Sequence, residues 1–271
     1  MPGSPFTDLD RPPLSAARLR AALVVPGGLW TEFVVHRETA STNADAVAAA
    51  RDGAAEGLVV VAERQTAGRG RLDRRWESPP RAGLAVSVLL RPGTNPRGYG
   101  WLPLLAGVAL VESVRRLAEL DAVLKWPNDL LIDDRKCAGI LAESGHGAVV
   151  LGIGLNVTLR AAELPHPGAT SLQLAGSACT DRDPLLRALL RTLADWYRRW
   201  REVDGDPETS GLRDAYRMHC GTLGRQVRVA LPDGSDLSGQ ASDVDGTGRL
   251  VVTGPDGAAT AVAAGDVVHV R

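Results

Sequence analysis

The chain has 271 residues, a net charge of −1 and a pI of about 6.5. This near-neutral balance argues against a protein that lives on DNA, RNA or an anionic membrane, although a local basic patch is compatible with it. Hydrophobic residues make up 44% of the chain and charged residues 23%, which is typical of a soluble globular protein whose core needs no disulfide or structural metal.

The cysteines, the histidines and the length of the apolar runs further limit the kind of protein that this chain can be. The three cysteines are odd in number and lack metal-type spacing, which predicts a reduced, cytoplasmic setting. The five histidines form no His-Glu-x-x-His pattern, so we expect no dedicated metal site. The first dozen residues lack the features of a targeting segment and no apolar run reaches ~18 residues, so we expect no membrane association.

Hydrophobic periodicity and turn residues predict alternating helices and strands. In chain order we expect a loose tail, a short helix at 16–25, a helix at 43–51 with Thr42 as its N-cap, a strand at 57–63, a polar loop at 64–82, a strand at 84–90, a helix at 101–120, a strand at 122–126, a hairpin at 130–143, a strand at 148–157, and helices at 183–203 and 208–218. Five short strands with Asp-Gly and Gly-x-Gly turns follow residue 221, which suggests a small barrel. The predicted fold is therefore α+β, with a mixed, largely antiparallel sheet rather than a doubly wound one.

The chain has 31 basic residues, of which only Lys125 and Lys136 are lysines. An arginine-rich genome explains the bias, yet a site that needs a single compact ammonium cannot accept the planar fork of arginine. A proline-fixed turn presents Asn128 and Asp129 at a strand end, and the predicted hairpin returns Lys136 beside them. We therefore expect chemistry here, with a surface ion pair as the alternative for Lys125.

The polar loop carries five arginines within twelve residues, including Arg69, Arg71 and Arg74. Arginine binds phosphate and carboxylate through paired hydrogen bonds, and the intervening Gly70 lets the backbone approach a ligand closely. Trp76 offers a flat face that can stack on a purine. The loop therefore predicts a flexible clamp for an anion; the alternative is a solvated basic loop with Trp76 in the core.

Two further polar sites are candidates for ligand binding. Asn156 ends a buried strand, where its amide can donate and accept as an adenine edge requires, or can simply cap a turn. Ser41-Thr42-Asn43 begins a predicted helix, where hydroxyls and free N–H groups converge, although plain N-capping is the commoner role. The chain contains neither a P-loop nor a Rossmann glycine motif, so a bound nucleotide would use another device.

The chain resembles biotin protein ligase (biotin–acetyl-CoA-carboxylase ligase) over about residues 35–270, in five motifs that occur in the family's order and spacing: Ser41-Thr-Asn, Gln65-Thr-Ala-Gly-Arg-Gly-Arg, Lys125-Trp-Pro-Asn-Asp, Lys136-x-Ala-Gly-Ile-Leu-x-Glu and Gly152-Ile-Gly-Leu-Asn-Val. The resemblance implies a tail and short helix over 1–34, a class II synthetase-like catalytic domain over 35–219 and an SH3-like β-barrel over 220–271. It also implies two reactions. Biotin and MgATP give biotinyl-5′-AMP and pyrophosphate, and the acyl group then passes to one lysine of a biotin carboxyl carrier protein or domain of an acyl-CoA carboxylase.

Carried over by motif position, the resemblance implies roles for three sets of residues. Those implied to bind biotin are Ser41, Thr42, Asn43, Gln65, Arg69, Gly70, Arg71, Lys136 and Gly139. Those implied to bind the nucleotide are Arg71, Arg74, Trp76, Lys125, Asn128, Lys136 and Asn156, with Trp76 and Asn156 at adenine. Those expected to be catalytic are Lys136, Arg69 and Asp129. In one departure from the family loop, Asp73 replaces a glycine and could pair with Arg71 or Arg75.

The physical chemistry of the implied reaction agrees with these roles. The biotin carboxylate and the α-phosphate are both anions, so Lys136 and Arg69 would help most by neutralising the developing charge. Closure of the arginine loop would keep water from the mixed anhydride. In the second step the carrier lysine must lose a proton, since only about one in a thousand is neutral near pH 7. Asp129 is the candidate that orients or deprotonates it.

The sequence also limits partners and alternatives. About 35 residues precede the first motif, too few for a three-helix DNA reader, so we expect a ligase that binds no operator DNA. We expect biotin as substrate, ATP, Mg²⁺ and a protein that is a monomer or weak homodimer. The alternatives are a lipoate protein ligase and a non-catalytic adaptor that binds protein or RNA through its C-terminal strands.

Overall fold

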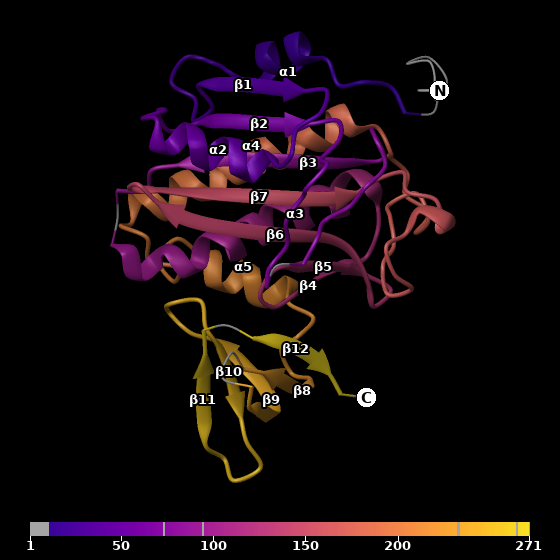
Figure 1. Cartoon of the computed structure of the whole chain (residues 1–271). Coiled ribbons are helices and arrows are strands. Elements are labelled where there is room, and N and C mark those ends of the chain that lie inside the picture. The colour runs from indigo at the N-terminus through magenta and orange to yellow at the C-terminus, as the bar shows by residue number, and fades with distance from the viewer. Residues whose placement is uncertain (1–10, 73, 94, 232–233, 264, 271) are drawn as a thin grey trace.

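The computed structural model describes residues 11–72, 74–93, 95–231, 234–263 and 265–270. They form a seven-stranded sheet with helices on both faces and, at one end of the molecule, a five-stranded sheet from the C-terminal part of the chain (Figure 1). This arrangement confirms the predicted α+β class with a mixed sheet. No described helix combines the length and the apolar character needed to cross a membrane.

The large sheet has the strand order β1-β2-β3-β7-β6-β5-β4, in which only β1 and β2 are parallel neighbours. The strands are β1 (Glu32–His36), β2 (Leu58–Ala62), β3 (Gly83–Leu90), β4 (Ala122–Lys125), β5 (Asp129–Ile132), β6 (Arg135–Gly145) and β7 (Ala148–Asn156). The strand β1 was not among the elements predicted from the sequence. Only Phe33 of its five residues is buried, so the run carries no clear alternation of apolar and polar residues.

Alternating side chains of the central strands serve two apolar layers, and this explains why β2 is buried throughout. Val59 and Val61 join the main core, whereas Leu58 and Val60 join a smaller cluster under the helix α2 (Thr42–Arg51). Each fully buried side chain of this size contributes about 1.5–3 kcal/mol relative to exposure. The continuous apolar run in the sequence is therefore a strand covered on both faces.

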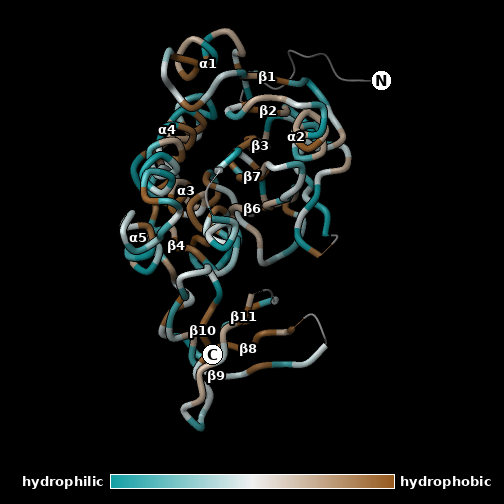
Figure 2. The backbone as a smooth tube through the Cα atoms, turned by 90° about the vertical axis from the view of Figure 1, so that its left-hand side faces the viewer, coloured by the Kyte–Doolittle hydropathy of each residue, from teal (hydrophilic) through white to brown (hydrophobic). Residues whose placement is uncertain are grey.

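Helices cover both faces of the large sheet (Figure 2). The helix α2 covers one face, and the helices behind the other face are α1 (Ala16–Leu23), α3 (Leu102–Ala118), α4 (Arg182–Glu202) and α5 (Leu212–His219). The predicted helix at 208–218 begins later, at Leu212, because Asp206 caps the backbone N–H groups of Glu208 and Thr209 in a separate turn.

The N-cap of α2 corrects one prediction. Ser41 rather than Thr42 is the cap, since its hydroxyl accepts a hydrogen bond from Ala44 N at 3.4 Å. Thr42 is instead the first residue of the helix, and its hydroxyl forms hydrogen bonds within the candidate site described below.

A buried ion pair ties the segment before α1 to the sheet. Arg182 at the start of α4 places Nη1 2.6 Å from Glu63 Oε2, and neither side chain is more than 8% exposed. The same guanidinium donates to Pro12 O, and the other carboxylate oxygen accepts from Leu14 N. Such a pair needs further hydrogen bonds to be stable in the interior, and Pro12 O, Gly83 O and Leu14 N supply them here. The pair thus anchors the chain beside the start of the arginine loop.

The C-terminal sheet has the order β11-β10-β9-β8-β12, all antiparallel, which confirms the five predicted strands. The strands are β8 (Gln226–Ala230), β9 (Asp236–Val244), β10 (Leu250–Thr253), β11 (Ala259–Val262) and β12 (Asp266–His269). Within the described residues the two outer strands, β11 and β12, are not paired with each other.

The two sheets are joined by specific contacts rather than by a loose linker. Trp126 is 1% exposed, and its indole N–H donates to Gly248 O in the β9–β10 turn at 3.1 Å. Asp243 of β9 accepts hydrogen bonds from Arg213 and Arg217 of α5 at 2.7–2.9 Å. These bonds, Arg217's first, hold the pKa of Asp243 at about 2. The C-terminal sheet is therefore fixed where its residues can reach the large sheet.

Candidate active site

One row of residues across the large sheet carries much of the candidate site. The register pairs Ala85 with Gly154, Gly154 with Gly139, Gly139 with Asp129, and Asp129 with Lys125, so that the row crosses β3, β7, β6, β5 and β4. Side chains of directly paired residues point to the same face of a sheet. The row thus runs from the small residues Ala85, Gly154 and Gly139 to Asp129 and Lys125. It lies on the same face of the sheet as α2.

The glycines of this row open the space that seats Trp76. A Cβ on Gly154 would overlap the indole, lying 2.6 Å from Nε1, and a Cβ on Gly139 would lie 3.3 Å from the ring. On the neighbouring row, Gly152 leaves room for the side-chain amide of Asn43 in the same way. Larger residues at these positions would push the ring and the amide off the sheet.

A β-bulge in β6 directs Lys136 toward the site. Leu130 pairs with Ala138 and Leu131 with Lys136, so Cys137 has no partner on β5. In a regular strand Lys136 would face away from Gly139, because residues three apart point to opposite faces. The extra residue reverses this relation and places Lys136 on the same face as Gly139 and Leu131.

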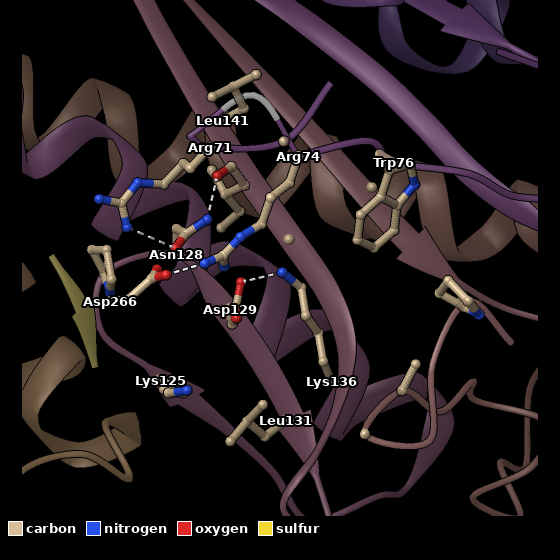
Figure 3. Close-up of a pocket in the computed structure, with 18 of the residues that line it drawn as sticks. Arg71, Arg74, Trp76, Lys125, Asn128, Asp129, Leu131, Lys136, Leu141 and Asp266 are labelled. Atoms are coloured by element: carbon tan, nitrogen blue, oxygen red, sulfur yellow. Dashed lines mark hydrogen bonds and ion pairs between the residues drawn. The ribbon is translucent and has the colours of Figure 1, made fainter. Parts of the chain in front are cut away.

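Lys136 is held between an acid and an aromatic ring (Figure 3). Its Nζ lies 2.7 Å from Asp129 Oδ1 and 5.8 Å from the centroid of Trp76, and its side chain is 29% exposed. The second lysine, Lys125, lies on β4 beside Asp129. Burial lowers the pKa of Lys125, although Asp129 opposes the shift. Both lysines line the pocket.

The start of α2 presents a connected set of polar groups. Gln65 Oε1 accepts from the backbone N–H of Thr42 at 2.9 Å and from its hydroxyl at 3.1 Å. The Ser87 hydroxyl lies 2.6 Å from Asn43 Oδ1 and 2.8 Å from Thr42 Oγ1. Asn43 also donates to Glu143 at 2.7 Å. These bonds fix the donors and acceptors of this end of the pocket before any ligand arrives.

The arginine loop is bound at three points, each on a different part of the fold. The partners are Glu143 on β6 for Arg69 (3.0 Å), Asn128 after β4 for Arg71 (3.2 Å), and Asp266 on β12 for Arg74. Burial lowers the pKa of Arg71. The loop therefore lies across the pocket with its cations turned to the site. The predicted pairing of Asp73 with Arg71 or Arg75 lies outside the described residues.

Asn128 and Asn156 differ in the hydrogen bonds that their side-chain amides form. Asn128 accepts from Arg71 and donates to Ile140 O at 2.9 Å, so it braces the loop against β6. Asn156 is 3% exposed, and its amide donates to Thr170 O at 2.9 Å. Asn156 thus supports the pocket wall, as in the capping alternative, while it still lines the pocket.

Sequence reasoning missed several residues that line the pocket or hold its walls. From the C-terminal sheet and the segment before it come Arg225, Asp266 and His269, which no motif indicated. Glu143 and Ser87 both form hydrogen bonds with the side-chain amide of Asn43. Glu143 could have been found, because it ends the Lys136-x-Ala-Gly-Ile-Leu-x-Glu motif; the other residues carry no local signal.

These elements enclose one large pocket of about 760 Å³. Seven cationic side chains and four carboxylates line it, an excess of three positive charges in a chain whose net charge is −1. The structure brings every predicted site residue to this pocket: Ser41, Thr42, Asn43, Gln65, Arg69, Gly70, Arg71, Arg74, Trp76, Lys125, Asn128, Asp129, Lys136, Gly139 and Asn156. Their individual roles stay predictions.

Comparisons with known proteins point to one family. Residues 37–159 match the model of the biotin/lipoate A/B protein ligase family, and residues 222–270 match the biotin protein ligase C-terminal domain. The chain is 44% identical to the biotin–[acetyl-CoA-carboxylase] ligase of Mycobacterium tuberculosis, over 98% of this chain and 100% of that one. It is 33% identical to the bifunctional ligase/repressor BirA of Bacillus subtilis, over 85% and 73% of the two chains.

Among solved structures, the chain is similar to the biotin protein ligase of Aquifex aeolicus in complex with biotin and ATP. The TM-score is 0.73 and the identity 26%, and the match covers 89% of this chain and 100% of the other.

Proposed function

The chain belongs to the biotin protein ligase family, and from this premise we propose that it is an ATP-dependent enzyme that activates biotin as biotinyl-5′-AMP and transfers biotin to a lysine of a biotin carboxyl carrier domain. The observation that carries the proposal is the Lys136 ammonium, directed by a bulge onto the floor of a strongly cationic pocket. We assign the chemistry to residues 35–219 and a supporting role to residues 220–271.

In the first step a carboxylate oxygen of biotin attacks the α-phosphorus of ATP, and the bond from that phosphorus to the β-phosphate oxygen breaks. Both reactants are anions, so their approach is opposed unless cations lie between them. We assign this role to Lys136, and Arg69 and Arg71, which line the same pocket, would add positive charge from the loop. Mg²⁺ would enter with ATP as the counter-ion of its phosphates.

The polar set at the start of α2 suits the head group of biotin, whose ureido ring both donates and accepts hydrogen bonds. Ser41, Thr42, Asn43 and Gln65 present hydroxyl and amide groups on one wall. Because their mutual hydrogen bonds are already made, they are pre-organised and lose little freedom on binding. The aromatic face of Trp76 would border the adenylate on the other side.

Asp129 is our candidate to orient the carrier lysine in the second step, in which the lysine nitrogen attacks the biotinyl carbonyl and AMP leaves. Its carboxylate forms an ion pair with Lys136 and lines the pocket. Asp129→Asn should therefore slow transfer from preformed biotinyl-AMP by about tenfold or more. An unchanged transfer rate would remove Asp129 from this role.

Isotope exchange between pyrophosphate and ATP tests the proposal directly. Exchange should depend on biotin and not on lipoate, and purified protein should then label a biotin carboxyl carrier domain. Exchange driven by lipoate would favour the lipoate ligase alternative. Absence of exchange, together with no thermal stabilisation by biotin plus ATP, would favour a non-catalytic adaptor.

A further inference from the structure

At the start of α2, the side-chain amide of Asn43 lies over a row of paired residues that fixes its orientation. Ser87 on β3, Gly152 on β7 and Leu141 on β6 are cross-strand partners, and Gly152 leaves the space that the amide fills. The amide nitrogen donates to Leu141 O at 3.4 Å and to Glu143 Oε2 at 2.7 Å. Because the carbonyl and the carboxylate can only accept, the amide oxygen of Asn43 is the atom that faces Ser87.

The amide of Gln65 has a fixed orientation for a similar reason. Its Oε1 accepts from the backbone N–H of Thr42 at 2.9 Å, so the oxygen rather than the nitrogen faces Thr42. The hydroxyls of Ser87 and Thr42 lie between the two amide oxygens. The oxygen–oxygen distances along this hydroxyl chain, taken in order from Asn43 to Gln65, are 2.6, 2.8 and 3.1 Å.

This hydroxyl chain is one proton short of what its contacts require. It has three oxygen–oxygen contacts, but both ends are amide oxygens that can only accept, and the two hydroxyls supply one proton each. Asn43, Thr42 and Ser87 are at most 4% exposed, so an unfilled contact among them is costly. An N–H that donates from the pocket to Gln65 Oε1 would allow Thr42 to turn its proton toward Ser87. Every contact of the chain would then be filled.

Resting on the proposed function, we infer that Ser87 and Glu143 are positioning residues that make this end of the pocket select its ligand by an N–H group. Glu143 holds Asn43 with its oxygen toward Ser87, and the Ser87 hydroxyl in turn requires the proton of Thr42. The ureido ring of biotin carries two N–H groups that can satisfy this chain, whereas the dithiolane ring of lipoate carries none. A site built around a substrate N–H discriminates against an analogue that lacks it, because a buried acceptor is then left unpaired.

The same argument says what happens when Glu143 no longer accepts. Without its carboxylate, the amide of Asn43 keeps only the longer bond to Leu141 O and is able to turn its nitrogen toward Ser87. Asn43 would then donate to Ser87, Ser87 to Thr42 and Thr42 to Gln65. The chain would fill its own contacts and would no longer require a proton from the ligand.

Isothermal titration of biotin into full-length variants tests this inference. Ser87→Ala removes a link of the chain and Glu143→Met removes the acceptor that holds Asn43, so each should raise the Kd of biotin about tenfold. Glu143→Gln keeps an acceptor oxygen and should stay within about threefold of wild type. The double variant Ser87→Ala/Glu143→Met should bind about as tightly as either single variant, since both changes break the same chain.

A change in the ligand gives a second measurement. The probes are the two biotin analogues in which a ring oxygen replaces one or the other ureido N–H. The wild-type protein should bind one of them at least about tenfold more weakly than biotin, and in Ser87→Ala this penalty should fall below about threefold. Ser113→Ala is the matched control, because Ser113 is a buried serine that donates to Ala109 O within α3 and does not line the pocket. It should leave all the dissociation constants unchanged.

The inference is overturned if Ser87→Ala, with a normal thermal unfolding midpoint, binds biotin like wild type or keeps the full penalty for the analogue. Equal weakening by Glu143→Gln and Glu143→Met would also overturn it. Glu143 would then act through the charge that it offers to Arg69, 3.0 Å away, rather than through Asn43. Failure of the wild-type protein to bind biotin would instead refute the proposed function.

Discussion

Replacing Lys136 with methionine tests the central role of its ammonium. Methionine keeps the length of the side chain and removes the charge, which leaves the carboxylate of Asp129, now 2.7 Å from Nζ, without its partner. Loss of one pre-organised electrostatic contact slows such steps by about 10²–10³-fold. In addition, an unpaired carboxylate about 4 Å from a reacting anion opposes it by roughly 4 kcal/mol at an effective dielectric of ~20.

The two contributions can be separated with the double variant Lys136→Met/Asp129→Asn. It should form biotinyl-AMP faster than the single Lys136→Met variant, because the unpaired carboxylate is gone, yet far more slowly than wild type. Rapid-quench measurement of adenylate formation with saturating biotin and ATP gives the three rates, and thermal unfolding confirms that each variant is folded. Wild-type adenylation by Lys136→Met would refute the reasoning, and a double variant no faster than the single would refute the electrostatic share assigned to Asp129.

Three further predictions concern packing and stability. Gly154→Ala should displace the indole it supports and raise KM for ATP more than tenfold, whereas Gly145→Ala, whose added Cβ meets nothing within 4 Å, should not. Arg182→Met should lower the free energy of unfolding in urea by about 3–5 kcal/mol, since Glu63 is left as a buried unpaired charge; a loss below 1 kcal/mol would contradict this. The pKa of Asp243 is depressed to about 2 from about 3.8, so its stabilisation is present above pH ~4 and is lost as the pH falls toward 2. Asp243→Asn should therefore show a smaller loss of stability than wild type across that pH range, and parallel curves would argue against the ion pair.

Much of the fold follows from local patterns in the sequence. The apolar run at 57–63 predicts a strand, which the structure has at Leu58–Ala62, and the periodicity of 101–120 predicts a helix, which the structure has at Leu102–Ala118. By contrast, β1 escaped prediction because only Phe33 of its five residues is buried, and because it pairs with the parallel strand β2, which the chain reaches only after the helix α2. No pattern within five residues records such a partner.

In the candidate site, the identity of the residues could be predicted from the sequence, but their arrangement in space could not. Its residues could be named because they lie in short motifs, but their geometry could not. Simple alternation along β6 turns Lys136 away from Gly139, and only the pairing with β5 reveals the bulge that reverses it. Arg225 lies 68 residues after Val157, the end of the last motif, and His269 lies later still; both reach the pocket only because the two sheets pack together.

Trp126 has a consequence for engineering chimeras of this enzyme. The residue belongs to the same motif as Lys125 and Asp129, yet its ring N–H donates a hydrogen bond to a carbonyl in the β9–β10 turn of the other sheet. A C-terminal module grafted from a relative would have to offer a carbonyl at the same place. Otherwise the indole N–H would be a buried donor without a partner, which costs about 1–3 kcal/mol of stability. The loss would fall beside Lys125 and Asp129. The two parts of the chain are therefore exchangeable only as a matched pair.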